Sequence, residues 1–248
     1  MKRILGSLGF AFINLLHPRM LWLMIWPVLI ALALWGTAVF VFWTQAALWV
    51  SGLLRQWIET ATLFIAWDAG AVALVGAKVI IVLMLVPLVQ LTALLILGVF
   101  GLPAMVEHVS SRRFAQLARR RGGSFAGSLW NSVVALAGMV VLGLVTLPLW
   151  LLPPLWPIIP VVILGWVNQR VLRYDALAEH ASADEMRAIF AANRGSLFLL
   201  GFVLALVAYV PMFGFFAPVL FGLGFIHFLL EQLQKWRQAP IEGETVRL

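Results

Sequence analysis

The chain has 248 residues, of which 63% are hydrophobic and only 11% are charged. Soluble domains carry about 45–50% apolar and about 25% charged residues, so the 17 basic and 10 acidic side chains are too few to cover a water-soluble fold. This composition indicates an integral membrane protein and excludes a soluble enzyme, a disordered tail and a nucleic-acid binder. The chain has no cysteine, which excludes disulfides and thiolate metal sites.

The first residues predict an amphipathic helix over residues 2–16. The opening Met-Lys-Arg and the apolar run after it are typical of a signal peptide. However, no small-x-small cleavage site follows, and His17-Pro18-Arg19 interrupts the run. We therefore expect an uncleaved helix that lies at the membrane surface. Its predicted apolar face consists of Ile4, Leu5, Leu8, Phe12, Leu15 and Leu16.

Long stretches without charge predict the membrane-spanning helices. Because about 20 apolar residues cross the hydrocarbon core, the charge-free stretches 20–54 and 79–106 each hold one long span. We place these spans at about residues 20–50 and 75–106, with residues 51–70 as an interfacial segment between them. The stretches 122–169 and 195–230 are each long enough for a helix, a turn and a returning helix; the second contains only the neutral His227.

These two longer stretches predict helical hairpins at about residues 128–170 and 195–231. Proline removes a backbone donor and ends a helix, so the proline cluster between Pro148 and Pro160 and the segment Tyr209–Pro218 are the expected tips. The apolar arms are roughly 20–27 Å long, which is shorter than the core of about 30 Å. We therefore expect hairpins that only partly penetrate, with tips buried in protein, and a homo-oligomer.

The predicted fold class is an all-α integral membrane protein. It has two long transmembrane helices, two short hairpins and the N-terminal amphipathic helix. These elements form one membrane domain over residues 1–235, followed by a polar tail at 236–248. Gly201 and Ala205 form a small-xxx-small pattern that lets two helices approach closely.

The distribution of basic residues predicts the orientation. Basic loops remain in the cytoplasm, so both termini are expected there, residues 51–70 outside, and the protein in a bacterial inner (plasma) membrane. Basic residues near a membrane also attract anionic lipids, by about 1 kcal/mol each. We therefore expect the bilayer and its anionic lipids as partners, and no nucleic acid. The most basic loop, residues 107–124, holds Arg112, Arg113, Arg119, Arg120 and Arg121.

Few residues are candidates for a substrate path. Lys78 is the one ionisable residue next to an apolar span; it is either a functional group inside the membrane or a marker of the outer end of the span, with its ammonium at the headgroups. Gln90 and Thr92 lie deeper in the same span and either face a path or join helices. No catalytic motif is present, so we expect no enzyme, no catalytic residue, no cofactor and no metal site.

Several short patterns resemble one known family. They are Gly9-Phe10, Pro18, Pro27, Leu102-Pro-Ala-Met-Val-Glu107, Arg173-Tyr-Asp-Ala-Leu-Ala178, Val210-Pro211 and Phe216-Ala-Pro-Val-Leu-Phe-Gly222. Together they resemble the CysZ-type sulfate permeases, which share a domain with the etoposide-induced proteins. The resemblance covers about residues 5–235. It implies two long transmembrane helices, partly penetrating hairpins and oligomers, with Arg173, Tyr174, Asp175, Pro211 and Pro218 as structural motif residues.

One feature of the resembled family is missing. Its sulfate-binding members carry Gly-Leu-Arg after the first proline, whereas here Pro18 is followed by Arg19, Met20, Leu21 and Trp22. Arg19 either takes the place of the missing arginine from a different position or is a charge that sets the topology. Two functions stay open: an oligomeric transporter or channel for a small solute, of which an anion is one case, and a non-transporting scaffold that organises lipids or partner proteins.

Overall fold

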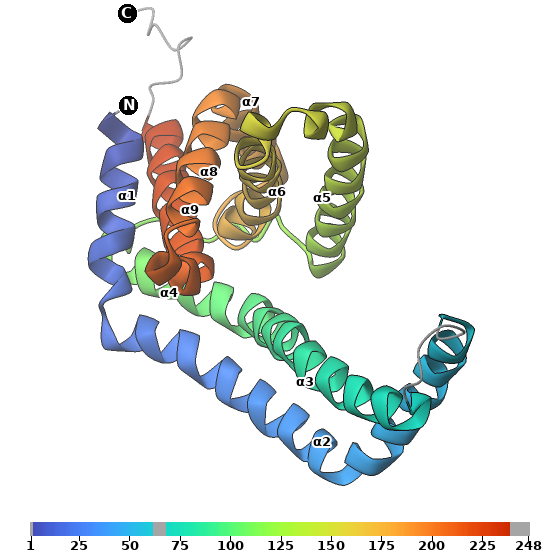
Figure 1. Ribbon diagram of the computed structural model, residues 1–248. Helices are drawn as coiled ribbons and strands as arrows, with labels where there is room; N and C mark the ends of the chain where they lie inside the picture. Colours follow the sequence, from blue (N-terminus) through green and yellow to red (C-terminus); the bar gives the residue numbers. More distant parts are fainter. Residues whose placement is uncertain (1, 62–67, 239–248) are drawn as a thin grey trace, which may run out of the picture. The chain divides into compact units, whose positions relative to one another are not determined.

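The computed structural model describes residues 2–61 and 68–238, and all regular secondary structure in these ranges is helical. This confirms the all-α prediction. Short π and 3-10 stretches, Leu97–Gly101, Leu147–Leu151 and Pro153–Leu155, follow α3 and α5. The α-helices (Figure 1) are α1 (Lys2–Leu15), α2 (Pro18–Ala61), α3 (Ala69–Ile96), α4 (Leu102–Arg113), α5 (Phe125–Val145), α6 (Ile158–Leu177), α7 (Ala183–Ala192), α8 (Arg194–Ala208) and α9 (Pro211–Gln238).

Five helical stretches within the described residues are long and apolar enough to cross a membrane, which supports an integral membrane protein. A sixth candidate is the pair of α7 and α8, which meet at a bend of 76°. The division into two long spans and two short hairpins therefore remains a prediction. The five stretches are Pro18–Glu59, Ala69–Arg113, Phe125–Val145, Pro153–Leu177 and Phe213–Gln238.

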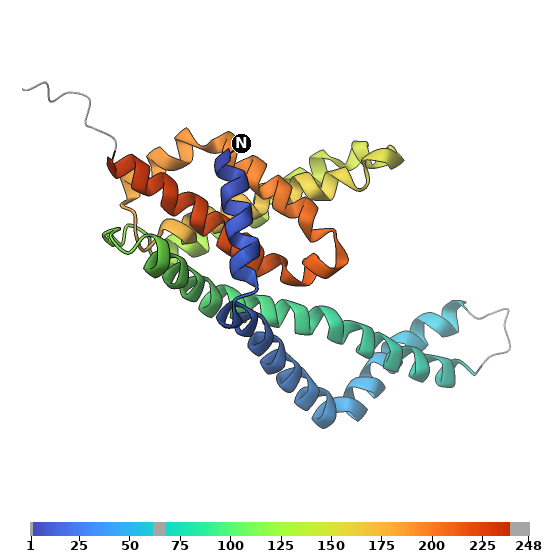
Figure 2. The same cartoon turned by 90° about the vertical axis from the view of Figure 1, so that its left-hand side faces the viewer.

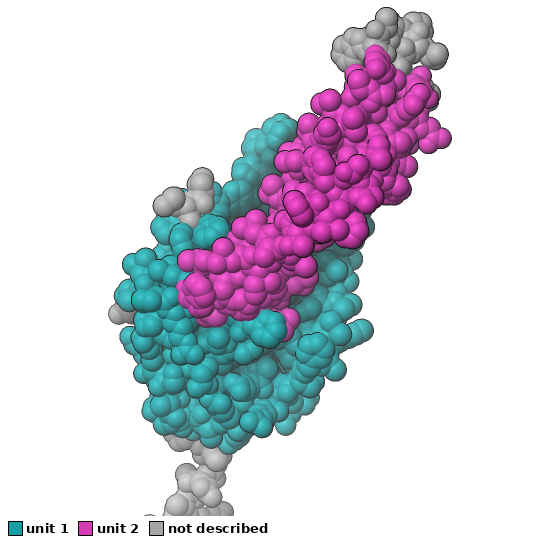
Figure 3. All heavy atoms as spheres, turned by 90° about the horizontal axis from the view of Figure 1, so that it is seen from below, with its two compact units in different colours: residues 1–21, 100–248 teal, residues 22–99 magenta. Residues whose placement is uncertain are grey.

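The chain forms two compact units, which Figure 3 shows in different colours. One unit comprises residues 22–99, and the other combines residues 1–21 with residues 100–248. We describe each unit by itself.

The unit of residues 22–99 contains most of α2 and all of α3. Asp68 caps α3 by accepting hydrogen bonds from the backbone N–H groups of Gly70 and Ala71. Large apolar side chains such as Phe40, which is 88% exposed, cover the outside of the unit. Exposed apolar side chains of this kind are suited to a lipid environment. The few buried side chains are mostly small, and they include Ala31, Ala47, Ala73, Ala77 and Ala93.

Helix α9 is the core of the other unit, where it packs against α1, α4, α6 and α8 (Figures 1 and 2). Its side chains are buried on every face between Val219 and Ile226, as expected for a helix that is apolar all round and surrounded by protein. Helix α1 lies along α9 and buries Ile4, Ser7, Leu8, Ala11 and Leu15. Leu5 and Leu16, which were expected on the same face, are exposed.

The break between α8 and α9 lies at the start of the predicted tip Tyr209–Pro218, but Pro218 itself does not interrupt a helix. Pro218 lies inside α9, which begins at Pro211. An internal proline costs the helix one hydrogen bond and crowds the carbonyl of the residue four positions earlier, here Gly214. Packing of the residues after Pro218 against four other helices compensates for this cost, and a helix inside a membrane bundle tolerates it for the same reason.

The first predicted hairpin corresponds to α5 and α6, which pack against each other. They have 21 and 20 residues, or about 30 Å each. Helix α6 is longer than its apolar run because it continues past Gln169 into charged residues, whereas α5 begins at Phe125, before the predicted start of the hairpin at about residue 128.

Two predicted segments lie partly outside the described residues. Helix α2 extends through residues 51–61 of the expected interfacial segment, with an ion pair of 2.5 Å between Arg55 and Glu59. Residues 62–67 of that segment lie outside the described residues, as do residues 239–248 of the expected tail.

Candidate functional site

Three of the four substrate-path candidates lie on α3, and no hydrogen bond among the described residues joins them to one another. Lys78 and Gln90 are exposed on α3, and Arg19 is exposed on the first turn of α2, in the other unit. Thr92 is half-buried and accepts a hydrogen bond of 2.9 Å from the indole Nε1 of Trp35. Thr92 therefore joins two helices within its unit, which is one of the two roles expected for it.

Replacing Thr92 by valine is expected to destabilise the protein by about 1 kcal/mol, which is within the range for hydrogen bonds between membrane helices. The change keeps the shape of the side chain but leaves the Trp35 indole N–H without its acceptor. Thermal unfolding in detergent measures the loss. Thr44→Val is the control, because Thr44 is exposed on the same helix as Trp35; equal melting temperatures for the two variants would contradict the prediction.

Two further polar contacts also join helices. The Asn131 side-chain amide donates a hydrogen bond of 2.7 Å to the backbone carbonyl of Arg170, and this contact links α5 to α6. Ser7 Oγ and His227 Nδ1 are 3.1 Å apart, and they link α1 to α9. These contacts are what a helical bundle needs to satisfy polar groups in an apolar environment.

Residues 107–113 of the predicted basic loop are helical and belong to α4. The arginines of residues 107–124 are mostly engaged with the protein itself. Arg112 donates a hydrogen bond of 2.8 Å to His17, and Arg113 lies over the ring of Phe10, 5.3 Å from its centroid. Arg119 forms ion pairs with Glu107 and with Glu179, and Arg120 pairs with Glu185 at 2.9 Å. Four of the five predicted lipid or topology arginines therefore have contacts that hold the loop in place.

The backbone of the same loop docks onto the segment after α6. The N–H groups of residues 120–123 donate four hydrogen bonds of 2.9–3.3 Å to carbonyls of residues 178–181. Arg121 has a φ of 47°, in the left-handed region. Gly122 and Gly123 lie so close to this segment that a Cβ atom on either would be within about 2.5 Å of it. The approach therefore requires both glycines.

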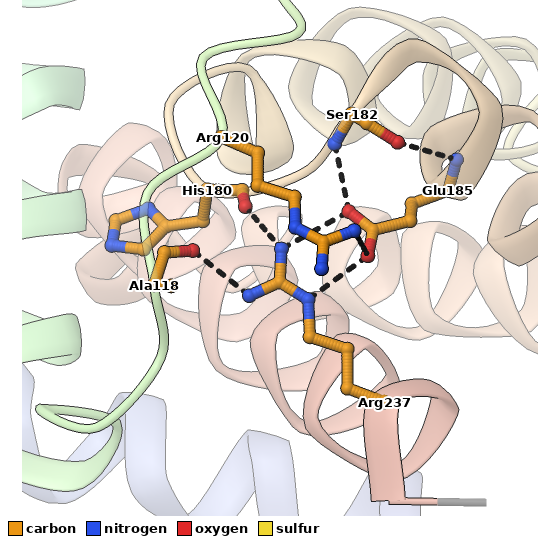
Figure 4. Close-up of polar contacts among 6 residues, drawn as sticks. All are labelled: Ala118, Arg120, His180, Ser182, Glu185 and Arg237. Carbon is orange, nitrogen blue, oxygen red and sulfur yellow. Dashed lines mark hydrogen bonds and ion pairs between the residues drawn. The ribbon is translucent and has the colours of Figure 1, made fainter.

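A polar cluster around Glu185 connects this loop to α7 and α9 (Figure 4). Arg237 donates hydrogen bonds to both carboxylate oxygens of Glu185, at 2.9 and 3.0 Å, and to the backbone carbonyls of Ala118 and His180. Glu185 also accepts from Arg120 and from the N–H of Ser182, whose hydroxyl caps α7 in return. The hydrogen bonds from Arg237 hold the pKa of the Glu185 carboxyl below its ordinary value.

The Arg173–Asp175 motif holds α5 against α6. The Tyr174 hydroxyl accepts a hydrogen bond of 3.1 Å from the backbone N–H of Ser124, the residue that caps α5. The Ser128 hydroxyl donates to Asp175 at 2.6 Å. Arg173 contacts the ring of Phe190 on α7, 4.9 Å from its centroid.

Two cavities lie within the unit that combines residues 1–21 and 100–248. The larger, of about 760 Å³, lies beside α1 and α9 and is lined by residues that include Arg3, Arg113, His227 and Glu231. The other, of about 550 Å³, is formed by α6, α7 and α8. Its polar lining is almost entirely arginine. Neither cavity is lined by Arg19, Lys78, Gln90 or Thr92.

Sequence reasoning did not select Glu185 and Arg237, although both form several hydrogen bonds in the structure. Ser182 and Glu185 match a capping box, but that pattern indicates only a helix start. Arg237 lies far along the chain and would otherwise be counted as a basic residue near the end. No local pattern connects positions 120, 185 and 237.

The chain was compared with known proteins. Neither the search of curated proteins nor the search of solved structures found a match. Residues 7–218 match the family described as Sulfate transporter CysZ/Etoposide-induced protein 2.4. Since this match spans most of the 248 residues, the membrane protein with these α-helical units belongs to the Sulfate transporter CysZ/Etoposide-induced protein 2.4 family.

Proposed function

We propose that the protein is a transporter or channel for a small anion, and that it works as an oligomer in the bacterial inner membrane with both termini in the cytoplasm. The family description includes a sulfate transporter, and the chain contains five candidate membrane spans. The observation that carries the proposal is the exposed position of Lys78 on α3.

In a single chain, Lys78 is exposed and has apolar side chains around it. Its neighbours Val75, Val79 and Val82 are all more than half exposed, and within the described residues Lys78 forms no ion pair or hydrogen bond. A cation at such a position is costly unless it lies in a bundle interior or a wet cavity. A second copy of the chain that covers this face of α3 would enclose the ammonium groups in a shared, anion-attracting path, and soluble and membrane oligomers are commonly built from identical copies in this way.

Flux measurements on the purified protein in liposomes test the proposal. Labelled sulfate and phosphate, each supplied in turn, are expected to enter protein-containing liposomes faster than empty ones. Lys78→Ala is expected to reduce this flux to the level of empty liposomes, because it removes the cation from the path. Lys78→Arg keeps the charge and is expected to retain flux.

Lys235→Ala is the matched control, because Lys235 pairs with Glu231 at the end of α9 and lies outside the proposed path. Normal flux in Lys78→Ala would mean that Lys78 only marks the end of a span. Absence of flux for both anions in the wild-type protein would contradict transport itself.

The second candidate function is a scaffold that organises lipids or partner proteins. The observation that favours it is the use of Thr92, Asn131 and His227 in contacts between helices. A protein without a path needs its polar groups only for such contacts. The liposome experiment separates the two functions, because a scaffold passes neither anion.

A further inference from the structure

The cavity formed by α6, α7 and α8 has an unusual concentration of positive charge. Four arginines line its volume of about 550 Å³, and no carboxylate is among the lining residues. Arg170 and Arg173 come from the C-terminal part of α6, Arg187 from α7, and Arg194 from the first position of α8. Like charges in such a small space repel one another, so the cavity is suited to a bound anion.

The protein neutralises little of this charge. Arg187 pairs with Asp184 at 2.7 Å, but both side chains are largely exposed, and an exposed pair contributes little. Within the part of the chain that the structure describes, the partners of Arg173 are neutral: Gln169, at 3.5 Å, and the Phe190 ring. The Nε of Arg170 is buried without a hydrogen-bond partner among the described residues. A buried donor of this kind costs free energy unless a ligand accepts from it.

The N-terminal end of α8 also favours an anion in this cavity. Arg194 is the first residue of this helix, and no side chain caps it, because the Asn193 amide donates instead to the carbonyl of Ile189. Helix N-termini carry a partial positive charge and favour anions. Guanidinium groups match phosphate oxygens with paired hydrogen bonds, which favours a phosphate group as the anion.

The walls of the cavity are aromatic and lie at the boundary between charged and apolar surface. Trp166, Phe190 and Phe198 are among the lining residues, and Phe198 is 37% exposed on α8. Beyond Arg194 helix α8 is apolar apart from Ser196, and α6 is apolar before Arg170 apart from Asn168 and Gln169. A phospholipid matches both features, because its phosphate group can contact the arginines and its acyl chains can contact the apolar surface.

We propose that this arginine pocket binds the phosphate group of an anionic phospholipid, with the acyl chains along the exposed apolar side of α8. The site differs from the arginines of residues 112–121, most of which are engaged with the protein. It depends on the membrane location of the chain but not on transport, so its test is independent of the flux experiment.

Native mass spectrometry of the full chain in a non-ionic detergent tests the proposal, with phosphatidic acid and phosphatidylcholine as the added lipids. Phosphatidic acid is expected to bind at one saturable site, and phosphatidylcholine is not. The double substitution Arg187→Gln with Arg194→Gln is expected to weaken this binding by at least about tenfold, as the loss of charge-assisted hydrogen bonds implies. Both side chains are exposed, so the double variant is expected to fold, and circular dichroism checks this. If the double variant does not fold, the binding measurement uses the single variant Arg194→Gln.

Arg19→Gln with Arg121→Gln is the matched control, because it removes two exposed positive charges outside the pocket. Equal weakening by both double variants would mean diffuse attraction to a basic surface and would overturn the site. A second binding measurement adds inorganic phosphate in place of the lipids. If it binds in the pocket and phosphatidic acid does not, the ligand is a free anion and the lipid assignment is wrong.

Discussion

Replacing Glu185 by alanine is expected to destabilise the protein by about 3–5 kcal/mol, the usual cost of removing one partner of a buried ion pair. The Glu185 side chain is 9% exposed and that of Arg237 is 17% exposed. Without the carboxylate, the Arg237 guanidinium stays in a largely buried position with only carbonyl acceptors. The loss also removes the acceptor for the N–H of Ser182.

Thermal unfolding in detergent measures this effect, with Asp184→Ala as the matched control. Asp184 precedes Glu185 on the same helix and also pairs with an arginine, but its side chain is 88% exposed. An exposed pair of this kind contributes at most about 1 kcal/mol, so Asp184→Ala is expected to remain close to wild type. Similar melting temperatures for the two variants would contradict a structural role for the Glu185 cluster.

The stabilisation by Glu185 is also expected to depend on pH. The hydrogen bonds from Arg237 lower the pKa of this carboxyl in the folded protein below its ordinary value of 4.5. The unfolded chain then takes up the proton first, so the stabilisation is complete above pH 4.5 and is lost as the pH falls through the folded-state pKa. The difference in melting temperature between wild type and Glu185→Gln is therefore expected to shrink in this acid range. A difference that stays constant to the lowest pH would contradict the assignment.

Replacing Gly201 by alanine is expected to cost about 1–3 kcal/mol through overpacking. Gly201 lies on α8, and a Cβ atom there would be 2.4 Å from the backbone carbonyl oxygen of Gly165 on α6. Because that oxygen belongs to a helix backbone, a side-chain rotation cannot relieve the clash. The two helices would have to separate, and the buried side chains around Leu200 and Leu204 would lose their packing.

Gly195→Ala is the matched control for this second prediction. Gly195 is on the same helix, and nothing lies within 4 Å of a Cβ atom placed there. Alanine favours a helix over glycine by up to about 1 kcal/mol, so this control is expected to be as stable as wild type or slightly more stable. If Gly201→Ala unfolds at the same temperature as Gly195→Ala, α6 and α8 do not approach each other at Gly165.

Sequence patterns indicated those structural features that depend on residues close together in the chain. Ser182 and Glu185 match the pattern of a capping box, and the structure contains that capping box at the start of α7, because a helix start depends on residues only three positions apart. Pro218 is the opposite case. Its own chemistry disfavours a helix, and the helix persists because residues from other helices pack against α9.

The candidate site was predicted less well than the fold. Lys78, Gln90 and Thr92 could be selected from their place in an apolar stretch, but only the structure shows that Thr92 accepts from Trp35. The arginines lining the pocket of α6, α7 and α8 are spread over residues 170–194. In the sequence they are typical only of a cytoplasmic, charged region.

The sequence by itself determined that this is a helical membrane protein of one recognisable family. Apolar runs without charge are a local property, and about 20 such residues are sufficient to span a bilayer. The tertiary structure alone decided which charged groups meet, because Arg120, Glu185 and Arg237 are brought together by the packing of separate helices and a loop. It also decided where positive charge is left uncompensated, since compensation depends on distances in space between residues far apart in the chain.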